Sequence, residues 1–197
     1  MTITAGDVAK LREMTGAGMM DAKKALTETN GNMEAALEWL RKSGALKMAK
    51  KADRATAEGR VHTYTHSNGK VAVMVEIMCE TDFVARNQDF INFCQDLALH
   101  IAAAAPQYTS RADVPDEVVQ KEKAFHVEQL KAEGKPAEVI EKILDGKLNK
   151  FYEDIVLMDQ KFVKDDAITI ANLLEQKVAA IGENIRIGRF VRLTLGN

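Results

Sequence analysis

A change in the spacing of apolar residues near residue 80 most constrains how this chain can fold. Val71 to Ile77 is an apolar run rich in β-branched residues, which is typical of a buried strand. After Asn87, a favourable residue for the start of a helix, apolar residues recur at helical spacing. These residues are Phe90, Phe93, Cys94, Leu97 and Ile101. The sequence therefore predicts a strand and then a helix, joined by a short connection.

That connection places a carboxylate beside an aromatic ring, in the order Thr81-Asp82-Phe83-Val84. Connections of this kind lie on the surface and carry function more often than core elements do. Phe83 is open to two interpretations. It is either a plug that closes the protein's own core or a wedge for a partner, because aromatic residues dominate both cores and interfaces. Local sequence alone favours the plug.

The strand belongs to a small sheet. Val61 to His66 and Lys70 to Met78 have period-two spacing and flank an Asn-Gly pair, which is a strong hairpin signal. A third strand is expected at Ile185 to Leu195, with helices against one face of an antiparallel or mixed sheet. Strict alternation would place on one face Ile185, Ile187, Arg189, Val191, Leu193 and Leu195, and on the other Arg186, Phe190, Arg192 and Thr194. We predict an α+β fold with a three-stranded antiparallel sheet core.

The first 46 residues or so predict three short helices that share a small core. Thr4 can cap the first helix with Asp7 three residues later, and Gly44 suits the position just after the third. Adjacent Met19 and Met20 cannot both face inward, so one of them is expected to be exposed. The predicted inward residues are Val8, Leu11, Met14, Met19 or Met20, Ala22, Leu26, Met33, Ala36, Leu37 and Leu40.

The stretch from Arg41 to Arg54 carries six basic residues against the single acidic residue Asp53. One interpretation is a solvated helical linker. Another is an electrostatic arm that helps to dock an acidic partner, since clustered charge speeds encounter. Binding of nucleic acid is a weaker alternative because no aromatic residues are interleaved with the charges. With this linker included, we place the helical module at residues 1–53 and the α+β core at residues 54–197.

Within the core, a long helical segment is expected over residues 117–157. Gly134 can end a first helix, Glu117 to Leu130, and Pro136 can start a second, Ala137 to Leu157. The two helices predict a projecting antiparallel hairpin, followed by a last helix that Gly182 stops. Apolar stripes support both, at Ile140, Ile143, Leu144, Leu148, Phe151 and Ile155, and at Ile170, Leu173, Leu174, Val178 and Ile181.

Several classes of chemistry lack their motifs. There is no GxxxxGK[ST] or GxGxxG phosphate loop, so we expect no direct nucleotide binding. No HExxH, paired CxxC or carboxylate cluster suggests a metal, and we expect no cofactor and no catalytic residues. Cys79 and Cys94 are isolated and are expected to be buried, reduced thiols. A thiol hydrolase that pairs Cys79 with His66 would lack a third, orienting group.

Composition also limits the partners. The 197 residues are 46% hydrophobic and 28% charged, with a net charge of −2, which is ordinary for a globular protein. This balance gives no reason to expect nucleic acid or a membrane as the main partner. No secretory signal and no apolar run of about 20 residues is seen, so a bacterial-type cytoplasmic protein is expected.

Two long and separated motifs carry a resemblance to a known family. CETDFVARN at residues 79–87 and TGAGMMDAKKAL at residues 15–26 closely resemble the translation elongation factor Ts family. The similarity continues through Met33 to Ala49, the turn at residues 134–136, residues 162–165 and the terminal strand. It therefore covers nearly the whole chain.

The resemblance implies a function and a set of site residues. Members of this family are non-enzymatic guanine-nucleotide exchange factors for elongation factor Tu. The resemblance implies that Thr81 to Val84 press between helices of elongation factor Tu near its Mg²⁺ site. It also implies that the first module, similar to a ubiquitin-associated domain, grips the nucleotide domain of that partner through Arg12, Met19, Met20 and Lys23. His66, at the hairpin tip, corresponds to a histidine that reaches toward the partner's nucleotide site.

Long members of the family carry two tandem core repeats, and this chain has room for one. We therefore predict a non-covalent homodimer, formed through the terminal strand with Phe190 at the contact. A general interaction module that binds nascent chains or a chaperone is the alternative function.

Overall fold

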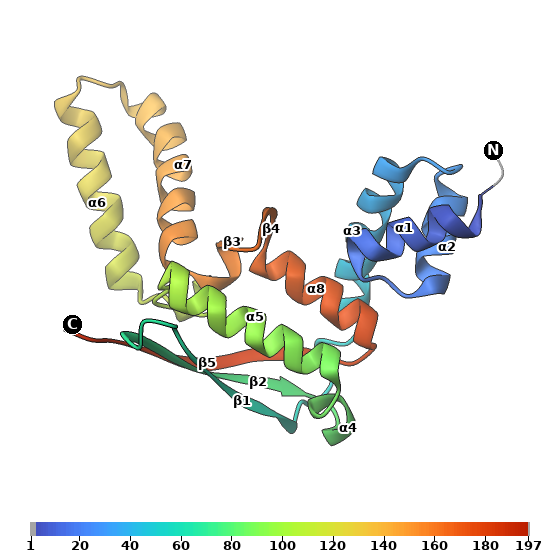
Figure 1. Ribbon diagram of the computed structural model, residues 1–197. Coiled ribbons are helices and arrows are strands. Elements are labelled where there is room, and N and C mark those ends of the chain that lie inside the picture. The colour runs from blue at the N-terminus through green and yellow to red at the C-terminus, as the bar shows by residue number, and fades with distance from the viewer. Residues whose placement is uncertain (1–2, 197) are drawn as a thin grey trace. The chain divides into compact units, whose positions relative to one another are not determined.

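The computed structural model describes residues 3–196 as an α+β protein, as the sequence predicts. Within these residues it has eight α-helices and five strands (Figure 1). The chain forms two compact units, one of residues up to Leu99 together with those from Ala171 onward, the other His100–Ile170. In the described residues, no helix is both long and apolar enough to cross a membrane.

The first unit begins with three helices, α1 (Ala5–Thr15), α2 (Met19–Glu28) and α3 (Met33–Ala49). The expected cap of α1 is present. The Asp7 amide donates to the Thr4 hydroxyl over 3.2 Å, and the Asp7 carboxylate accepts from the Thr4 amide over 2.9 Å. Hydrogen bonds from Thr4 hold the pKa of Asp7 below its ordinary value. The shared core consists of Val8, Leu11, Ala22, Ala25, Leu26 and Ala36.

Three details of this module differ from the sequence prediction. Met14 is exposed, because Thr15 takes the next place on the inner face and donates its hydroxyl to the Leu11 carbonyl over 2.6 Å. Met19 and Met20 are both exposed, so neither is a core residue. Met19 is the first residue of α2, and the buried residues of that helix are Ala22, Ala25 and Leu26.

The sequence predicted that α3 ends before Gly44, and this prediction is wrong. Gly44 is buried inside the helix, which continues to Ala49. A Cβ atom at position 44 would lie 3.8 Å from the carbonyl oxygen of Glu175 in α8 (Ile170–Ile181). A methyl group there would make an ordinary contact with α8, so space does not require this glycine, and the helix continues through it despite the low helix propensity of glycine.

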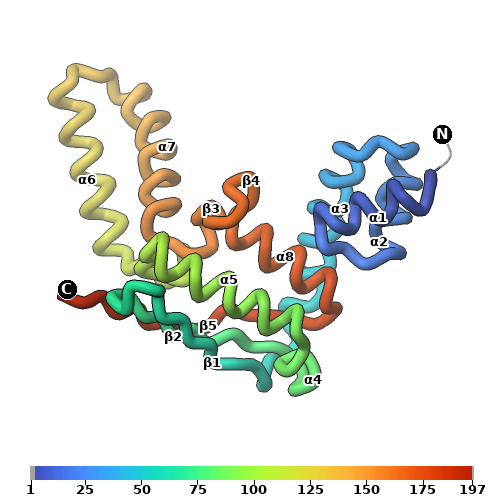
Figure 2. The backbone as a smooth tube through the Cα atoms, viewed as in Figure 1, coloured from blue at the N-terminus to red at the C-terminus, as the bar shows by residue number. Residues whose placement is uncertain are grey.

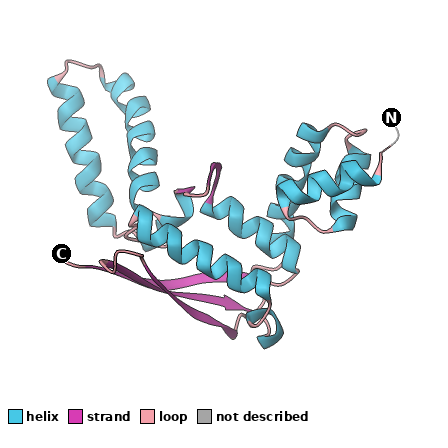
Figure 3. Ribbon diagram, in the orientation of Figure 1, coloured by secondary structure: helices cyan, strands magenta, loops and turns pink. Residues whose placement is uncertain are grey.

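The sheet has the order β1-β2-β5 and is antiparallel throughout, with β1 at Glu58–Thr65, β2 at Val71–Cys79 and β5 at Ile185–Thr194. Figure 2 shows the red C-terminal strand beside the hairpin that β1 and β2 form. The helices α5 (Gln88–Ala104) and α8 lie along one face of the sheet (Figure 3). As predicted, α5 follows Asn87, whose side chain accepts the Asp89 amide over 2.7 Å. The buried residues of this layer include Val73, Val75, Ile77, Phe90, Phe93, Cys94, Leu97, Leu174, Val178 and Ile185.

The predicted alternation along β5 is wrong, because the strand contains a β-bulge. Phe190 pairs with Val75 and Ile187 with Ile77, so two residues of β5 lie opposite Glu76 alone. The extra residue reverses the alternation after position 189. Phe190 therefore shares the inner, helix-covered face with buried Val75, and the exposed residues are Val191, Leu193 and Leu195.

The second unit contains the predicted helical hairpin, α6 (Asp116–Ala132) and α7 (Ala137–Ile155). The two helices pack on each other, and the expected stripe on α7 is buried or half-buried. Gly134, with φ of 73°, directly follows the C-cap residue of α6, and Pro136 directly precedes α7, as predicted. A two-stranded ribbon of β3 (Lys161–Phe162) and β4 (Asp165–Thr169) completes the unit and was not predicted.

One histidine is buried in the second unit. The ring of His100 accepts the Val163 amide at Nδ1 over 3.3 Å, and Nε2 lies 3.0 Å from Gln160 Oε1. Because Nδ1 accepts, Nε2 must carry the proton and donate to Gln160, so this ring is held neutral. Burial lowers the pKa of His100.

Candidate functional site

The connection after β2 folds into a single helical turn, α4 (Asp82–Ala85), and presents Phe83 to solvent. The Phe83 side chain is 82% exposed. Ala85 is the buried residue of this turn, and α4 contacts β1 and β2. The plug interpretation is therefore wrong, and the ring is free to contact a partner.

Thr81 caps this turn and connects it to the rest of the unit. Its hydroxyl oxygen accepts the Val84 amide over 3.4 Å and donates to Glu183 Oε1 over 2.7 Å. The other carboxylate oxygen of Glu183 accepts the backbone amides of Glu80 and Thr81, each over 3.1 Å. One carboxylate thus accepts three hydrogen bonds from the two residues that precede α4.

The next residue, Asn184, ties the same turn to the segment that follows α3. Its buried side-chain amide donates to the Arg54 carbonyl over 2.9 Å and to the Ala52 carbonyl over 3.4 Å. Its backbone amide donates to the Glu80 carboxylate, which also pairs with Arg54 over 3.4 Å. The end of the basic stretch is therefore anchored beside the residues that hold α4.

Two further basic residues of this stretch have partners. Lys47 pairs with Asp21 over 2.7 Å, and Lys51 Nζ donates to the Val178 carbonyl over 3.4 Å. Burial, together with the nearby Arg54 charge, lowers the pKa of Lys51. Lys47 and Lys51 are therefore not free side chains of a solvated linker or of an electrostatic arm, because each has a partner within the first unit.

Asp82 is positioned differently from Thr81. Its carboxylate is partly exposed and pairs with Arg86 over 3.1 Å, one turn along the helix. Exposed pairs of this kind contribute little to stability, typically below about 1 kcal/mol. Asp82 can therefore exchange Arg86 for a group on a partner at small cost.

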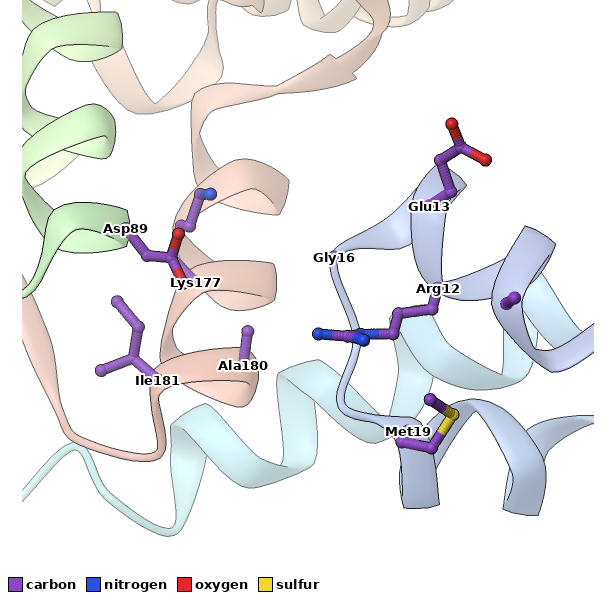
Figure 4. Close-up of a pocket in the computed structure, with 9 residues that line it drawn as sticks. Arg12, Glu13, Gly16, Met19, Asp89, Lys177, Ala180 and Ile181 are labelled. Carbon is purple, nitrogen blue, oxygen red and sulfur yellow. The ribbon is translucent and has the colours of Figure 1, made fainter.

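The residues predicted on the first module are all exposed, and they line two hollows. Arg12 and Met19 line one of about 420 Å³, together with Asp89, Lys177, Ala180 and Ile181. Figure 4 shows the Arg12 guanidinium extending from α1 into this space. Met20 and Lys23 line a shallower hollow of about 370 Å³ on α2. The four residues thus form two neighbouring groups on one small module.

His66 lies away from this site. It follows β1 at the hairpin turn, where its Nδ1 atom is 3.0 Å from the Tyr64 hydroxyl. The hairpin end of the sheet is marked by the pair Thr65 and Ala72, and the end near α4 by the pair Glu58 and Cys79. Ala72 and Cys79 are seven residue steps apart along β2. At about 3.4 Å per residue, this is roughly 24 Å. The structure therefore brings His66 close neither to Phe83 nor to Cys79.

The two cysteines are buried free thiols. Burial raises the pKa of Cys79 to about 11 and that of Cys94 to about 12, so both stay protonated at neutral pH. Together with the distance to His66, this removes the thiol hydrolase alternative. Among residues 3–196, no group of three or more histidines, cysteines or acidic residues is placed to hold a metal ion.

Sequence reasoning missed Glu183 and Asn184. Their partners Glu80, Thr81 and Arg54 lie more than 100 residues earlier in the chain. The only local signal is their position directly after Gly182, where a polar pair also fits an ordinary exposed turn.

Comparison with known proteins places this arrangement in a family. The model of the family described as "Elongation factor TS" matches residues 17–197. The chain belongs to the elongation factor Ts family. It is 52% identical over 196 residues to elongation factor Ts of Geobacter sulfurreducens, covering 100% of this chain and 91% of that protein. It is 53% identical over 196 residues to elongation factor Ts of Fervidobacterium nodosum, with 100% of both covered. Membership of the elongation factor Ts family confirms the resemblance seen in the motifs and assigns the chain a role in translation elongation.

Proposed function

We propose that this protein promotes the release of GDP from elongation factor Tu and that it makes and breaks no covalent bond in doing so. Family membership supports the choice of partner. The observation that carries the mechanism is an 82% exposed phenylalanine on a helical turn that hydrogen bonds hold in place.

The physical basis is linkage between two ligands of one protein. A GTPase holds its nucleotide tightly because the phosphates, Mg²⁺ and the switch loops support one another. A partner that binds the distorted, empty form more tightly must weaken nucleotide binding, and the nucleotide must weaken the partner by the same factor. The exchange factor therefore needs a group that fits only the distorted form.

In this proposal, Phe83 is that group. A phenylalanine ring is large and rigid and loses little rotamer freedom when it is buried. Asp82, one residue earlier, places a carboxylate beside the ring. There it accepts a hydrogen bond from a displaced element of elongation factor Tu or repels negative groups near its Mg²⁺ site.

The first module supplies a second contact. Met19 and Met20 are adaptable apolar side chains, and Arg12 and Lys23 add positive charge at the rim. We propose that these four residues grip the nucleotide domain of elongation factor Tu. Two contacts on one chain raise the effective concentration of the wedge at its target.

Release of fluorescently labelled GDP from elongation factor Tu, followed by stopped flow, tests the proposal. Acceleration by micromolar amounts of this protein supports exchange activity. An unchanged release rate would refute it and would favour a general interaction module that binds nascent chains or a chaperone.

We further propose that two copies pair through the outer face of the sheet. No described element of the first unit lies over this face (Figure 1). Exposed apolar side chains cross all three strands there, since Met74 pairs with Val191 and Ala72 with Leu193. The exposed members are Val61, Met74, Val191, Leu193 and Leu195. A two-fold contact sets such a face against its own copy.

Pairing also addresses the separation of His66 from Phe83. These residues lie at opposite ends of one sheet, so one chain presents them far apart. In a two-fold pair, His66 of one chain and Phe83 of the other can contact the same molecule of elongation factor Tu.

Light scattering over a dilution series tests the pairing. We expect a mass near twice 21.8 kDa at tens of micromolar. Leu193→Asp should give the monomer mass without unfolding, whereas Phe125→Asp, at an exposed apolar residue of α6, should leave the pair intact. A monomer mass for the unaltered protein would rule the pair out.

A further inference from the structure

The orientation of Phe83 depends on the backbone of α4, because the ring itself is exposed. An isolated helical turn is unstable in water, because nucleation costs more than one hydrogen bond returns. The helix α4 has only four residues, and the exposed ring has little contact of its own to fix it. Something outside α4 must therefore hold the turn.

Glu183 is placed to do so. Its carboxylate accepts the amides of Glu80 and Thr81 and the hydroxyl of Thr81, and that hydroxyl in turn caps α4 at Val84. The chain of contacts runs from Glu183 through Thr81 to the backbone on both sides of Phe83. Hydrogen bonds to a charged acceptor are roughly twice as strong as neutral ones.

Glu183 itself is fixed on two sides. Gly182, with φ of 91°, ends α8 directly before it, and β5 begins at Ile185 directly after Asn184. Asn184 is buried and donates to the carbonyls of Ala52 and Arg54. The two-residue turn is therefore a rigid point to which both α4 and the end of the linker are attached.

We propose that Glu183 is a positioning residue for nucleotide exchange, which holds Phe83 in its presenting orientation through Thr81. The proposal rests on the exchange function proposed above. Glu183 need not touch elongation factor Tu. Its role is to keep the turn ordered before the partner arrives, so that binding does not have to order it.

The test compares three variants with the unaltered protein. Glu183→Ala removes all three hydrogen bonds. Glu183→Gln keeps an oxygen that accepts both backbone amides and should restore much of the effect. Glu175→Ala is the matched control, because Glu175 is a half-buried glutamate of α8 whose side chain hydrogen-bonds to Asn172 in the same helix.

The first measurement is made on the free protein and does not depend on exchange activity. Amide hydrogen exchange by nuclear magnetic resonance should show faster exchange at Glu80, Thr81 and Val84 in Glu183→Ala, with the strands of the sheet unchanged. Glu183→Gln should keep most of the protection and Glu175→Ala all of it. Unchanged protection of these amides in Glu183→Ala would overturn the proposal.

The second measurement is the rate of labelled GDP release from elongation factor Tu at a temperature at which every variant is folded. We expect Glu183→Ala to lower kcat/KM by about tenfold, the factor that corresponds to one hydrogen bond to a charged group. Equal losses in Glu183→Ala and Glu175→Ala would mean that Glu183 has only a general structural role, which contradicts the proposal. Loss of amide protection with a full exchange rate would also contradict it and would leave the exchange function standing.

If the unaltered protein does not accelerate GDP release, the proposed function fails, and with it the role of Glu183 in exchange. The amide measurement then still shows whether Glu183 orders α4. The two failures are therefore distinguishable.

Discussion

Replacing Phe83 by alanine should separate activity from stability. The ring is 82% exposed, so its removal takes little apolar surface out of the folded protein. Exposed substitutions of this kind change the free energy of unfolding by about 0.5 kcal/mol or less. Almost the whole ring is available to a partner, however, and burial of a phenylalanine side chain contributes about 1.5–3 kcal/mol. Phe83→Ala should therefore lower kcat/KM for GDP release by about 10- to 150-fold.

Two other phenylalanines provide controls for this measurement. Phe125 is also exposed, on α6, so Phe125→Ala should leave both the melting temperature and the exchange rate unchanged. Phe93 is fully buried, and Phe93→Ala should cost about 3–5 kcal/mol of stability. Exchange rates are measured by stopped flow and stability by urea unfolding. If Phe83→Ala destabilises the protein as Phe93→Ala does, or leaves exchange intact, the wedge mechanism is refuted.

Two further predictions concern stability and domain structure. The pKa of His100 is lowered by burial, so the unfolded chain takes up the proton first as the pH falls below about 6.5. The folded state should therefore have full stability above that pH and lose it below, by up to about 1.4 kcal/mol per pH unit, until the folded pKa is reached. Urea unfolding at several pH values measures this dependence, and His100→Asn should reduce its slope. An equal slope in His100→Asn would contradict the assignment. We also propose residue 53 as a domain boundary, so that deletion of residues 1–53 should leave a folded sheet by circular dichroism but weaken binding to elongation factor Tu by at least about tenfold. Loss of the circular dichroism signal would show that the two parts fold as one.

Most of the helices and strands were predictable because they carry local signals, whereas the short β3–β4 ribbon was not. The Asn-Gly turn marks the hairpin of β1 and β2, the Thr4–Asp7 cap marks α1, and the apolar stripe on α7 marks the helical hairpin. The spacing of apolar residues and the capping of helices depend on residues within a few positions of each other. These features can therefore be predicted from the local sequence.

The orientation of side chains at the site was not predictable in the same way. Phenylalanine is a residue type common in cores, so the local sequence does not reveal that Phe83 faces outward. The structure shows it, because Ala85 is the buried residue of the turn and Phe83 is exposed. Glu183 and Thr81 are 102 positions apart, and no local pattern joins them. Gly44 looks like a helix end in the local sequence, but α3 continues through it to Ala49, and its burial beside Glu175 of α8 depends on the tertiary structure.

The bulge opposite Glu76 lets the last strand hold one extra residue while its pairing with β2 stays regular on both sides. Two residues, Gly188 and Arg189, occupy the place of one. Loss of either one would remove the bulge and leave Phe190 opposite Val75 in a regular ladder, still facing the helices. A single-codon deletion in the regularly paired part after the bulge would instead exchange the inward and outward faces of the strand from that point to its end. The bulge is thus the one described position of this strand at which a residue can be lost without turning the later apolar side chains over.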